Sequence, residues 1–295
     1  MGKIIKACLW TIIAVGAICL IGFLVYNFVL ASQKEVSHPE VSFEIKDYGT
    51  IKMELYPEYA PNTVANIIKL VENGYYNDKV IYGKDEICLY LGRNSEGEAV
   101  NPNISLIDKN IEEGSDGDYE YSINGEFIAN DFKQNTLKHE KGVVTLIRND
   151  YTQYFSSLSE QSYNSGNAQI AIMMDDAANL NGVYAAFGKV IEGMDILEKM
   201  YNELEIAPKE TENAGEEETS MAEVASEGSA TDAESSDENG EEESAGIDAF
   251  KTYPVITSAT IDTKGVDYGM PETEEAFNYE EYMNNLMQQY YGGNQ

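Results

Sequence analysis

Few side chains in this sequence could carry covalent or metal chemistry. Among 295 residues there are three cysteines, Cys8, Cys19 and Cys88, and two histidines, His38 and His139. Neither a CxxC nor an HExxH spacing occurs, and the two histidines stand alone in the chain. A structural zinc site, a Ser–His–Asp triad and a Cys–His pair therefore have little support. We expect neither a metal nor a cofactor.

The charge of the chain argues against nucleic acid as a partner. Lys and Arg number 19 against 52 Asp and Glu, a formal net charge of −33, whereas a nucleic-acid-binding surface needs clustered basic residues. Part of the acid falls in residues 209–249, where 41 residues hold 15 acidic side chains, one lysine and no aromatic residue. This composition predicts a disordered linker. A Ca²⁺ site is the alternative, but the EF-hand spacing of acidic residues is absent.

A long apolar run near the N-terminus predicts a membrane anchor. It begins after Lys6 and continues for 27 residues without a charge, and a spanning helix needs about 20 apolar residues. The lysines before it, Lys3 and Lys6, favour a cytoplasmic N-terminus. We expect a stub and anchor over 1–33, membrane contact through 7–31, and a single-pass protein of the cell membrane whose C-terminal domain is extracytoplasmic. A signal peptide cleaved after Val29–Ala31 is the alternative, although its apolar region is usually shorter.

The exported part of the chain reads as mainly β. Segments 41–47 and 51–56 alternate apolar and polar residues around a short turn and predict a hairpin. Further strands are expected at 80–82, 86–92, 142–147, 168–174, 183–191 and 254–262.

Two amphipathic helices accompany the strands. The first starts at Ala60–Thr63, with proline in the first turn, and its apolar residues recur at helical spacing up to Gly74. The second covers 194–204. Many strands with one early and one late helix predict a closed β-barrel capped by two helices. After a linker at 34–40, this domain would occupy 41–268.

The C-terminal residues 269–295 form a separate tail. Pro271 starts a predicted amphipathic helix over 272–291. Its apolar residues, Ala276, Tyr279, Met283, Leu286 and Tyr290, recur at a heptad-like spacing. The helix could dock onto the barrel, or its Tyr/Met face could bind a partner protein.

Four segments together resemble a known family. They are Tyr48–Asn77, Tyr121–Phe127, Leu137–Arg148 and Asn181–Met200, which contain APNTV, NGEF, GVVTLIR and FGKVIEGMDIL. In this order they resemble the cyclophilins, barrel-fold peptidyl-prolyl cis-trans isomerases, in their divergent bacterial branch. The resemblance covers about 41–206 and the last strand at 254–262. It implies that 209–249 is an insertion into the barrel, where extra loop length costs little.

The resemblance implies a site for proline-containing peptide segments. Rotation about an X–Pro bond crosses a barrier of ~18–20 kcal/mol without a catalyst. Cyclophilins hold the prolyl ring in an apolar pocket while an arginine, supported by a glutamine, donates a hydrogen bond near the prolyl nitrogen, so catalysis needs no covalent step. In this sequence the arginine position aligns with Gly83. Gln169 matches a glutamine of the site and is the catalytic residue that the resemblance retains.

The same resemblance assigns the positions that bind substrate. They are Cys88, Leu91, Arg148, Ala171, Leu180 and Tyr184. Cys88 and Ala171 stand where the pocket has phenylalanines, and Tyr184 replaces a histidine. Arg148 matches an arginine that bacterial relatives place beside the peptide groove. The pocket thus keeps its framework and lacks its principal hydrogen-bond donor.

Two other cations lie close in sequence to the missing arginine. Lys84 would take its position if the alignment slipped by one residue, although strand alternation points it to the opposite face. Arg93 lies beyond the strand. Plain surface charge is the alternative interpretation for both.

Two functions therefore remain open. The first is a membrane-anchored isomerase acting on X–Pro bonds of exported proteins, with activity reduced because Gly83 replaces the arginine. The second is a catalytically inactive cyclophilin-fold module that binds peptides or proteins at the membrane surface.

Overall fold

The structure, a computed structural model, describes residues 15–16, 19–26, 37–207 and 247–291. The chain divides into two units, Met1–Ser37 and His38–Gln295. In the first unit, the described residues within the predicted anchor are helical, and most of the anchor lies outside the described residues. No helix in the part of the chain that the structure describes is long and apolar enough to cross a membrane.

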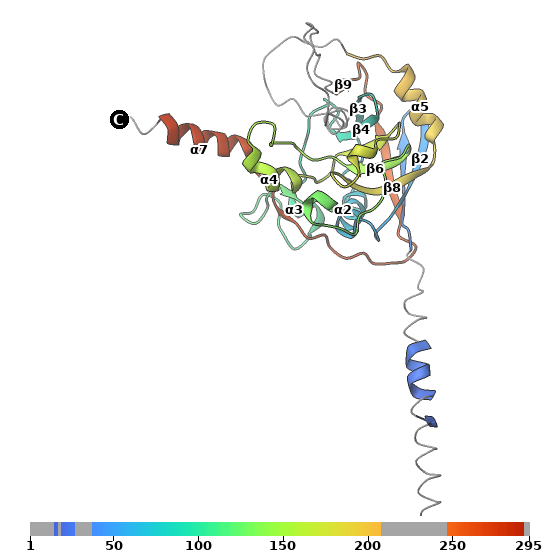
Figure 1. Ribbon diagram of the computed structural model, residues 1–295. Coiled ribbons are helices and arrows are strands. Elements are labelled where there is room, and N and C mark those ends of the chain that lie inside the picture. Colours follow the sequence, from blue (N-terminus) through green and yellow to red (C-terminus); the bar gives the residue numbers. More distant parts are fainter. Residues whose placement is uncertain (1–14, 17–18, 27–36, 208–246, 292–295) are drawn as a thin grey trace, which may run out of the picture. The chain divides into compact units, whose positions relative to one another are not determined.

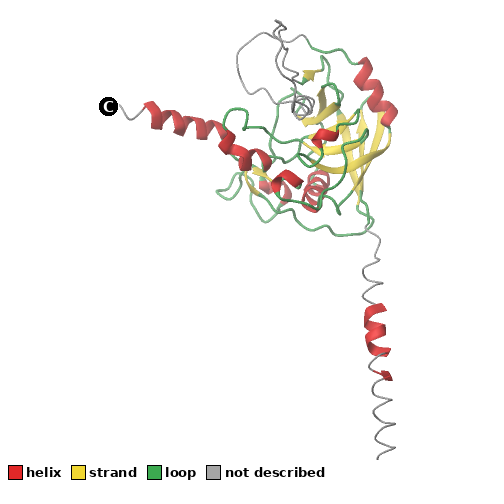
Figure 2. Ribbon diagram, viewed as in Figure 1, coloured by secondary structure: helices red, strands yellow, loops and turns green. Residues whose placement is uncertain are grey.

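Nine antiparallel strands form one curled sheet (Figures 1 and 2). In spatial order they are β10 (Ile256–Asp262), β1 (Glu40–Ile45), β2 (Gly49–Leu55), β8 (Ala185–Glu192), β6 (Val143–Leu146), β7 (Ile170–Met173), β4 (Cys88–Arg93), β3 (Val80–Lys84) and β9 (Asp248–Ala249). Each strand predicted from the sequence is present within a few residues of its expected bounds.

The predicted closed barrel is wrong in one respect, because the sheet has two ends, β10 and β9. A closed barrel needs a continuous ladder between its first and last strands. Here β3 meets the residues before β10 only through an isolated bridge between Val80 and Val255 and neighbouring main-chain hydrogen bonds such as Ile81 N–H to Pro254 O. The outer edge of β3 pairs instead with β9.

Strand β9 lies within the segment predicted to be a disordered linker, so the end of that prediction is wrong. Most of 209–249 lies outside the described residues, but its last two residues form β9, and Phe250 N–H donates to Tyr82 O. An unpaired strand edge recruits main chain whatever its side chains are. Composition, which predicted disorder up to residue 249, carries no information about this backbone pairing.

The main core lies between the inner face of the sheet and two helices, both of which the sequence predicted. Helix α2 (Pro61–Glu72) buries the apolar stripe expected from its spacing, and α5 (Met194–Glu203) buries Leu197 and Met200. Val64, Ile67 and the strand residue Phe43 are fully buried. Removing this much apolar surface from water is the main stabilising contribution to a fold without a disulfide in its described part.

The N-terminus of α2 is capped by a distant glutamate. The helix has no side-chain cap of its own at Ala60. The carboxylate of Glu126, in the NGEF segment, accepts hydrogen bonds from Asn62 N–H (2.9 Å), Thr63 N–H (2.7 Å) and the Thr63 hydroxyl (2.7 Å). These are donors that a helix start leaves unsatisfied. Two of the motifs that carry the family resemblance therefore meet here.

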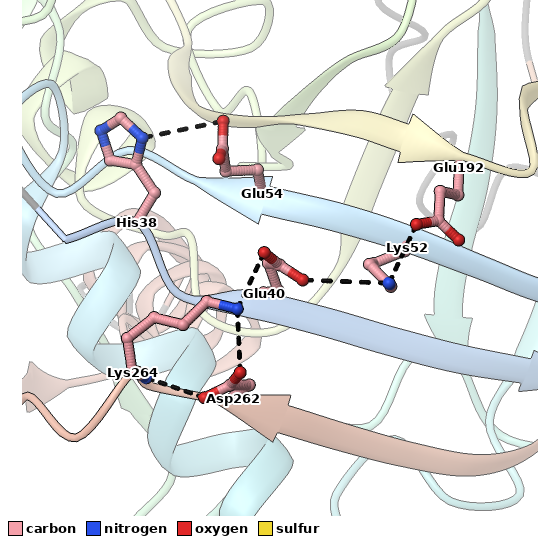
Figure 3. Close-up of polar contacts among 7 residues, drawn as sticks. All are labelled: His38, Glu40, Lys52, Glu54, Glu192, Asp262 and Lys264. Atoms are coloured by element: carbon pink, nitrogen blue, oxygen red, sulfur yellow. Dashed lines mark hydrogen bonds and ion pairs between the residues drawn. The ribbon is translucent and has the colours of Figure 1, made fainter.

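Charged side chains cross four neighbouring strands on an exposed face (Figure 3). The N···O distances are 3.0 Å for Lys52–Glu192, 3.9 Å for Lys52–Glu40, 2.9 Å for Lys264–Glu40 and 2.8 Å for Lys264–Asp262. Glu192 of β8, Lys52 of β2 and Glu40 of β1 alternate in sign, and Lys264, which follows the end of β10, lies between Glu40 and Asp262. Such cross-strand pairs fix register, and each one contributes little to stability at the surface.

The C-terminal tail is extended before it becomes helical. Helix α7 spans Tyr279–Tyr291, later than the predicted start at 272. Before it, β11 (Glu274–Glu275) pairs with β5 (Tyr121–Ser122), and Ala276 N–H donates to Glu120 O. These sheet hydrogen bonds compete with the first helical turn and delay it.

The start of α7 packs on the domain through aromatic rings. The ring of Tyr279 stacks on that of Tyr151 at 5.2 Å, and Tyr282 meets Phe155 edge to face. Tyr290, further along the helix, is exposed. The first half of α7 thus packs on the domain, which is one of the two predicted alternatives. A protein partner for the tail stays a prediction.

Candidate functional site

A second apolar cluster lies on the opposite face of the strands that enclose the main core. Along β7, Ile170 and Ile172 belong to the main core, whereas Ala171 and Met173 belong to the second cluster, as strand alternation requires. We call it the site cluster; it comprises Val80, Tyr82, Cys88, Tyr90, Val143, Ala171, Met173, Ala177, Leu180, Tyr184 and Ala186.

Four of the residues predicted to bind substrate meet in the site cluster. They are Cys88, Ala171, Leu180 and Tyr184, contributed by β4, β7, the short 3-10 helix Ala178–Leu180 and the residues before β8. All are nearly fully buried, Tyr184 exposing 3% of its surface. A prolyl ring can therefore reach them only if the groups that cover the cluster move.

One predicted position does not face the site cluster, and another is blocked. Leu91 belongs to the main core, and the residue before it, Tyr90, faces the cluster instead. At Gly83 a Cβ would lie 2.7 Å from the Asp248 carbonyl oxygen and 2.9 Å from Ile247 Cγ2. The position aligned with the family's arginine is therefore closed by the chain that forms β9.

Strand β3 contains a bulge next to Gly83. Ile81 pairs with Leu91, and Gly83 pairs with Tyr90. Two steps along β3 thus match one step along β4, and Tyr82 is the extra residue. A β-bulge changes which face the neighbouring side chains point to. Tyr82 lies in the site cluster with Val80, two residues before it, whereas Lys84, two residues after it, points to the opposite face.

A second bulge, in β4, changes the direction of an arginine. Val80 pairs with Arg93, and Ile81 pairs with Leu91, so Gly92 is the extra residue on β4. Gly92 has a φ of +115°, in the region that favours glycine. This is the residue type and the conformation that a bulge of this kind needs.

The β4 bulge brings Arg93 against Gln169. A Cβ on Gly92 would lie 3.1 Å from the Ala168 carbonyl oxygen, so the two segments approach closely. Arg93 Nε donates a long hydrogen bond of 3.4 Å to Gln169 Oε1. The guanidinium carbon lies 4.1 Å from the ring centroid of Tyr82, a stacked cation–π arrangement. The interpretation of Arg93 as surface charge beyond the strand is therefore wrong.

A buried polar network fixes the chain just before β7. Asn66 of α2 donates to the carbonyl oxygen of Asn167 and accepts from the Tyr121 hydroxyl at 2.7 Å. The Tyr76 hydroxyl donates to the Ala168 carbonyl oxygen at 2.8 Å. Burial raises the pKa of both tyrosines, so they remain neutral donors. This network holds in place the segment from which the site's glutamine projects.

The second arginine lies at the other side of the cluster. The Arg148 guanidinium carbon is 4.6 Å from the ring centroid of Tyr184 and 5.2 Å from that of Tyr163, and its Nε donates to Val183 O at 3.3 Å. Burial raises the pKa of Tyr184 to about 12, although the charge of Arg148 opposes this rise. Arg148 is thus beside the cluster, as its predicted place next to a peptide groove requires.

Lys84 does not face the site. Its ammonium donates to the Tyr201 carbonyl oxygen at 2.6 Å and lies 4.5 Å from the centroid of that residue's ring, in α5. Strand alternation predicted this direction. The alternative alignment, slipped by one residue to bring Lys84 into the arginine position, therefore has no support in the geometry.

His139 and Cys88, whose residue types are often catalytic, are buried packing residues here. His139 is buried between the Asn181 side-chain oxygen and the Thr145 hydroxyl, and burial lowers its pKa to about 4. Cys88 contacts Met173, and burial raises the pKa of its thiol. Among residues 37–207 and 247–291, no group of three or more His, Cys, Asp or Glu could hold a metal ion.

Tyr82 and Tyr90 belong to the site cluster although neither was predicted to, and Arg93 contacts Tyr82 and Gln169 instead of standing free on the surface. One signal for the arginine was present, because an isolated glycine inside a strand pattern often marks a bulge. Gly92 is that glycine. The extra residue of the β3 bulge is Tyr82, a residue type that gives no such signal.

A curled antiparallel sheet with two packed helices and a site on its outer face agrees with comparisons with known proteins. Residues 40–225 match the family model described as cyclophilin type peptidyl-prolyl cis-trans isomerase/CLD. This match spans more than half of the chain, so the chain belongs to the cyclophilin-type peptidyl-prolyl cis-trans isomerase family.

Individual relatives carry the same name. A probable peptidyl-prolyl cis-trans isomerase of Brucella suis biovar 1 is 29% identical over 191 residues, which cover 63% of this chain and 84% of the relative. Peptidyl-prolyl cis-trans isomerase-like 2 of Rhizopus delemar is 26% identical over 175 residues, 59% of this chain; the chain spans only 26% of that protein. A crystal structure of a Cryptosporidium parvum cyclophilin type isomerase has a TM-score of 0.47 at 16% identity, covering 76% of this chain and 98% of that one.

Proposed function

We propose that this chain is a peptidyl-prolyl cis-trans isomerase of reduced activity that acts on X–Pro bonds of exported proteins. The observation that carries the proposal is the meeting of Ala171, Leu180 and Tyr184 in one cluster, with Gln169 two residues before Ala171, directly ahead of β7. Three separate segments of the chain supply these residues. Family membership supplies the reaction.

The chemistry requires only binding and orientation. The apolar faces of Leu180 and Tyr184 suit a prolyl ring, which has no hydrogen-bonding group. During rotation the C–N bond loses its partial double-bond character and the prolyl nitrogen gains a localised lone pair. A donor placed near that nitrogen, and absent from contact in the planar ground state, lowers the barrier.

Reduced activity follows from two features of the site. No side chain larger than hydrogen fits at Gly83 beside β9, so β3 offers no cation at that position. The site cluster is buried, and Ala171 offers a prolyl ring less contact area than the phenylalanine it replaces.

The proposed location outside the cell membrane rests on the sequence. An uncharged run of membrane-spanning length follows Lys3 and Lys6, and the positive-inside rule then orients the domain outward. Protease added to intact spheroplasts tests it: the domain should be digested, and its protection would contradict the proposal. Clients would then be segments of exported proteins that contain proline.

A protease-coupled proline-peptide assay on the 295-residue chain tests the activity. We expect cis-to-trans conversion faster than in buffer, with a rate that scales with protein concentration. A rate equal to buffer at every concentration would contradict the isomerase proposal.

The second candidate is a non-catalytic module that binds proline-containing segments. The closure of Gly83 by the Asp248 main chain favours it, because no donor side chain can stand at this position while β9 is in place. Peptide binding by fluorescence anisotropy, combined with no acceleration in the assay above, would support this candidate. Gly83→Arg is not a fair rescue test, because its side chain would displace β9.

A further inference from the structure

We propose that Arg93 is the catalytic cation of this site, donating a hydrogen bond to the prolyl amide in place of the absent β3 arginine. The inference rests on the proposed isomerase function and names a residue that performs it. It concerns a side chain on a different strand, brought to the site by the bulge at Gly92.

The position of the guanidinium carries the argument. Its Nε donates to Gln169 Oε1, its Nη1 donates to Gly97 O at 3.1 Å, and its carbon lies over the ring of Tyr82. Three contacts from three segments hold one rotamer of a flexible side chain, so little entropy remains to be lost on binding substrate. Arg93 is half-buried, which strengthens its field relative to an exposed cation.

The direction of the guanidinium follows from the β4 bulge. Tyr82 faces the site cluster together with Val80, and the bulge at Gly92 turns Arg93 to the same face, where the ring supports it. Ala171, on the strand beside β4, pairs with Tyr90 in the same cluster. The cation and the proposed proline-binding surface therefore share one face of the sheet.

The other cations near the site are less suited to this role. Lys84 faces α5, as described above. Arg148 lies over Tyr184, and its Nε is bonded to a main-chain oxygen beside that ring. Arg93 is the cation that the structure places against Gln169, the one catalytic residue that the family resemblance retains.

A guanidinium suits the step that must be accelerated. It has five N–H donors in one plane and stays charged at any physiological pH. One edge can orient on Gln169 while another donates to the prolyl nitrogen as that nitrogen becomes pyramidal. No bond is broken other than the π component of the amide, and no proton moves.

Steady-state kinetics on single variants of the 295-residue chain test the proposal. For Arg93→Ala we expect kcat to fall on the order of tenfold to a hundredfold with KM changed less than about threefold, as for loss of one preorganised donor. Arg93→Lys keeps charge without the planar fork and should recover only part of kcat. Millimolar guanidinium ion should raise the activity of Arg93→Ala and leave the original protein unchanged.

Lys84→Ala is the matched control. Lys84 also lies over a tyrosine ring and bonds a main-chain oxygen, but it faces away from the site. We expect its kcat to stay within about twofold of the original. Arg148→Ala, beside the peptide groove, should act mainly on KM.

The outcomes separate the two proposals. A protein no faster than buffer would overturn the isomerase proposal and this inference with it. An active protein whose Arg93→Ala variant keeps kcat, or whose Lys84→Ala variant loses as much, would overturn this inference alone. If circular dichroism shows Arg93→Ala unfolded, Arg93→Gln, which keeps a polar group beside Gln169, carries the same expectation.

Discussion

The start of α2 and the β3–β4 hairpin differ in how well the family motifs predict their contacts. At the start of α2, two family motifs meet, and Glu126 satisfies the donors that the helix leaves open. At the hairpin, two bulges shift the register: Arg93 lies over Tyr82 on the site face, and Gly83, which the alignment placed at the arginine position, is blocked by the main chain of Asp248. The helix start keeps the family's framework, whereas the hairpin rebuilds the site on it.

The difference has a physical cause. A helix cap needs one acceptor at one distance from fixed backbone donors, so few solutions exist. A strand face changes with every inserted residue, because side chains alternate with a period of two. The cap at the start of α2 therefore keeps the same contacts as long as its acceptor is present. In the β3–β4 hairpin, a role in the site can pass from one residue to a neighbouring one. The predictions below test whether stability depends on the first region and site geometry on the second.

The largest effect is expected at Glu126. Replacement by alanine would leave the Asn62 and Thr63 amides and a buried hydroxyl without their acceptor. Each unsatisfied buried donor costs about 1–3 kcal/mol, so we expect Glu126→Ala to lower the free energy of unfolding by roughly 4 kcal/mol in urea titrations.

A control keeps the shape of the side chain. Glu126→Gln retains one acceptor oxygen and should lose roughly half as much. The remaining folded protein should keep its kcat, since Glu126 is outside the site cluster. A loss under about 1 kcal/mol for the alanine variant would show that the cap is not what holds α2.

The next effect concerns pH and His139, which lies between the framework and the site. Its pKa falls from 6.5 to about 4 because burial disfavours the charged ring. Below pH 6.5 the unfolded chain takes up a proton that the folded protein refuses until about pH 4, so stability falls as the pH is lowered through this window. At about 1.4 kcal/mol per pKa unit, the loss is about 3 kcal/mol.

His139→Gln removes this titration. Between pH 7 and pH 4 its free energy of unfolding should fall by about 3 kcal/mol less than that of the original protein, because the carboxylates of both proteins titrate alike. Parallel curves for the two proteins across this range would contradict the assignment of a buried neutral imidazole.

Replacement of Gly92 should lower stability less than the changes above, and it should also lower kcat. Alanine there meets a φ of +115° and a carbonyl oxygen 3.1 Å away, which should cost about 2 kcal/mol. Because the bulge aims Arg93, kcat should fall as well. Urea titration and the isomerase assay measure the two effects separately.

Gly114→Ala supplies the comparison. Gly114 has a φ of +74°, but no atom lies within 4 Å of its Cβ position, so only backbone strain of about 1 kcal/mol remains. Its kcat should not change. Equal kcat in both variants would mean that the bulge at Gly92 does not position the arginine.

Much of the fold could be predicted from the sequence because it depends on periodicity. The strands and both helices were found where apolar residues recur at a spacing of two or of 3.6. Three features were not predicted, and each depends on backbone pairing between distant segments: β9 on the edge of β3, β11 on β5, and the open ends of the sheet. Main-chain hydrogen bonds leave no pattern in side-chain type.

The site was predictable in part for the same reason. Ala171, Leu180 and Tyr184 lie on segments whose register the family motifs fix, and they meet as the resemblance implied. Leu91 and Gly83 lie in the hairpin, where an alignment without gaps cannot represent two bulges on opposite strands.

The smallest effect on the free energy of unfolding is expected for the exposed charges of Figure 3. A variant there shows how much surface ion pairs stabilise the strands compared with the buried core. Lys52 lies within 3.0 Å of Glu192 and 3.9 Å of Glu40, yet it remains partly exposed. Surface ion pairs contribute a median near zero, so Lys52→Ala should lower the free energy of unfolding by less than about 0.5 kcal/mol. Raising the salt to about 1 M should abolish even this difference, because the Debye length falls to about 3 Å. A loss comparable to that of Glu126→Ala, persisting in salt, would mean that the strands near β1 depend on charge pairing more than on the core beneath them.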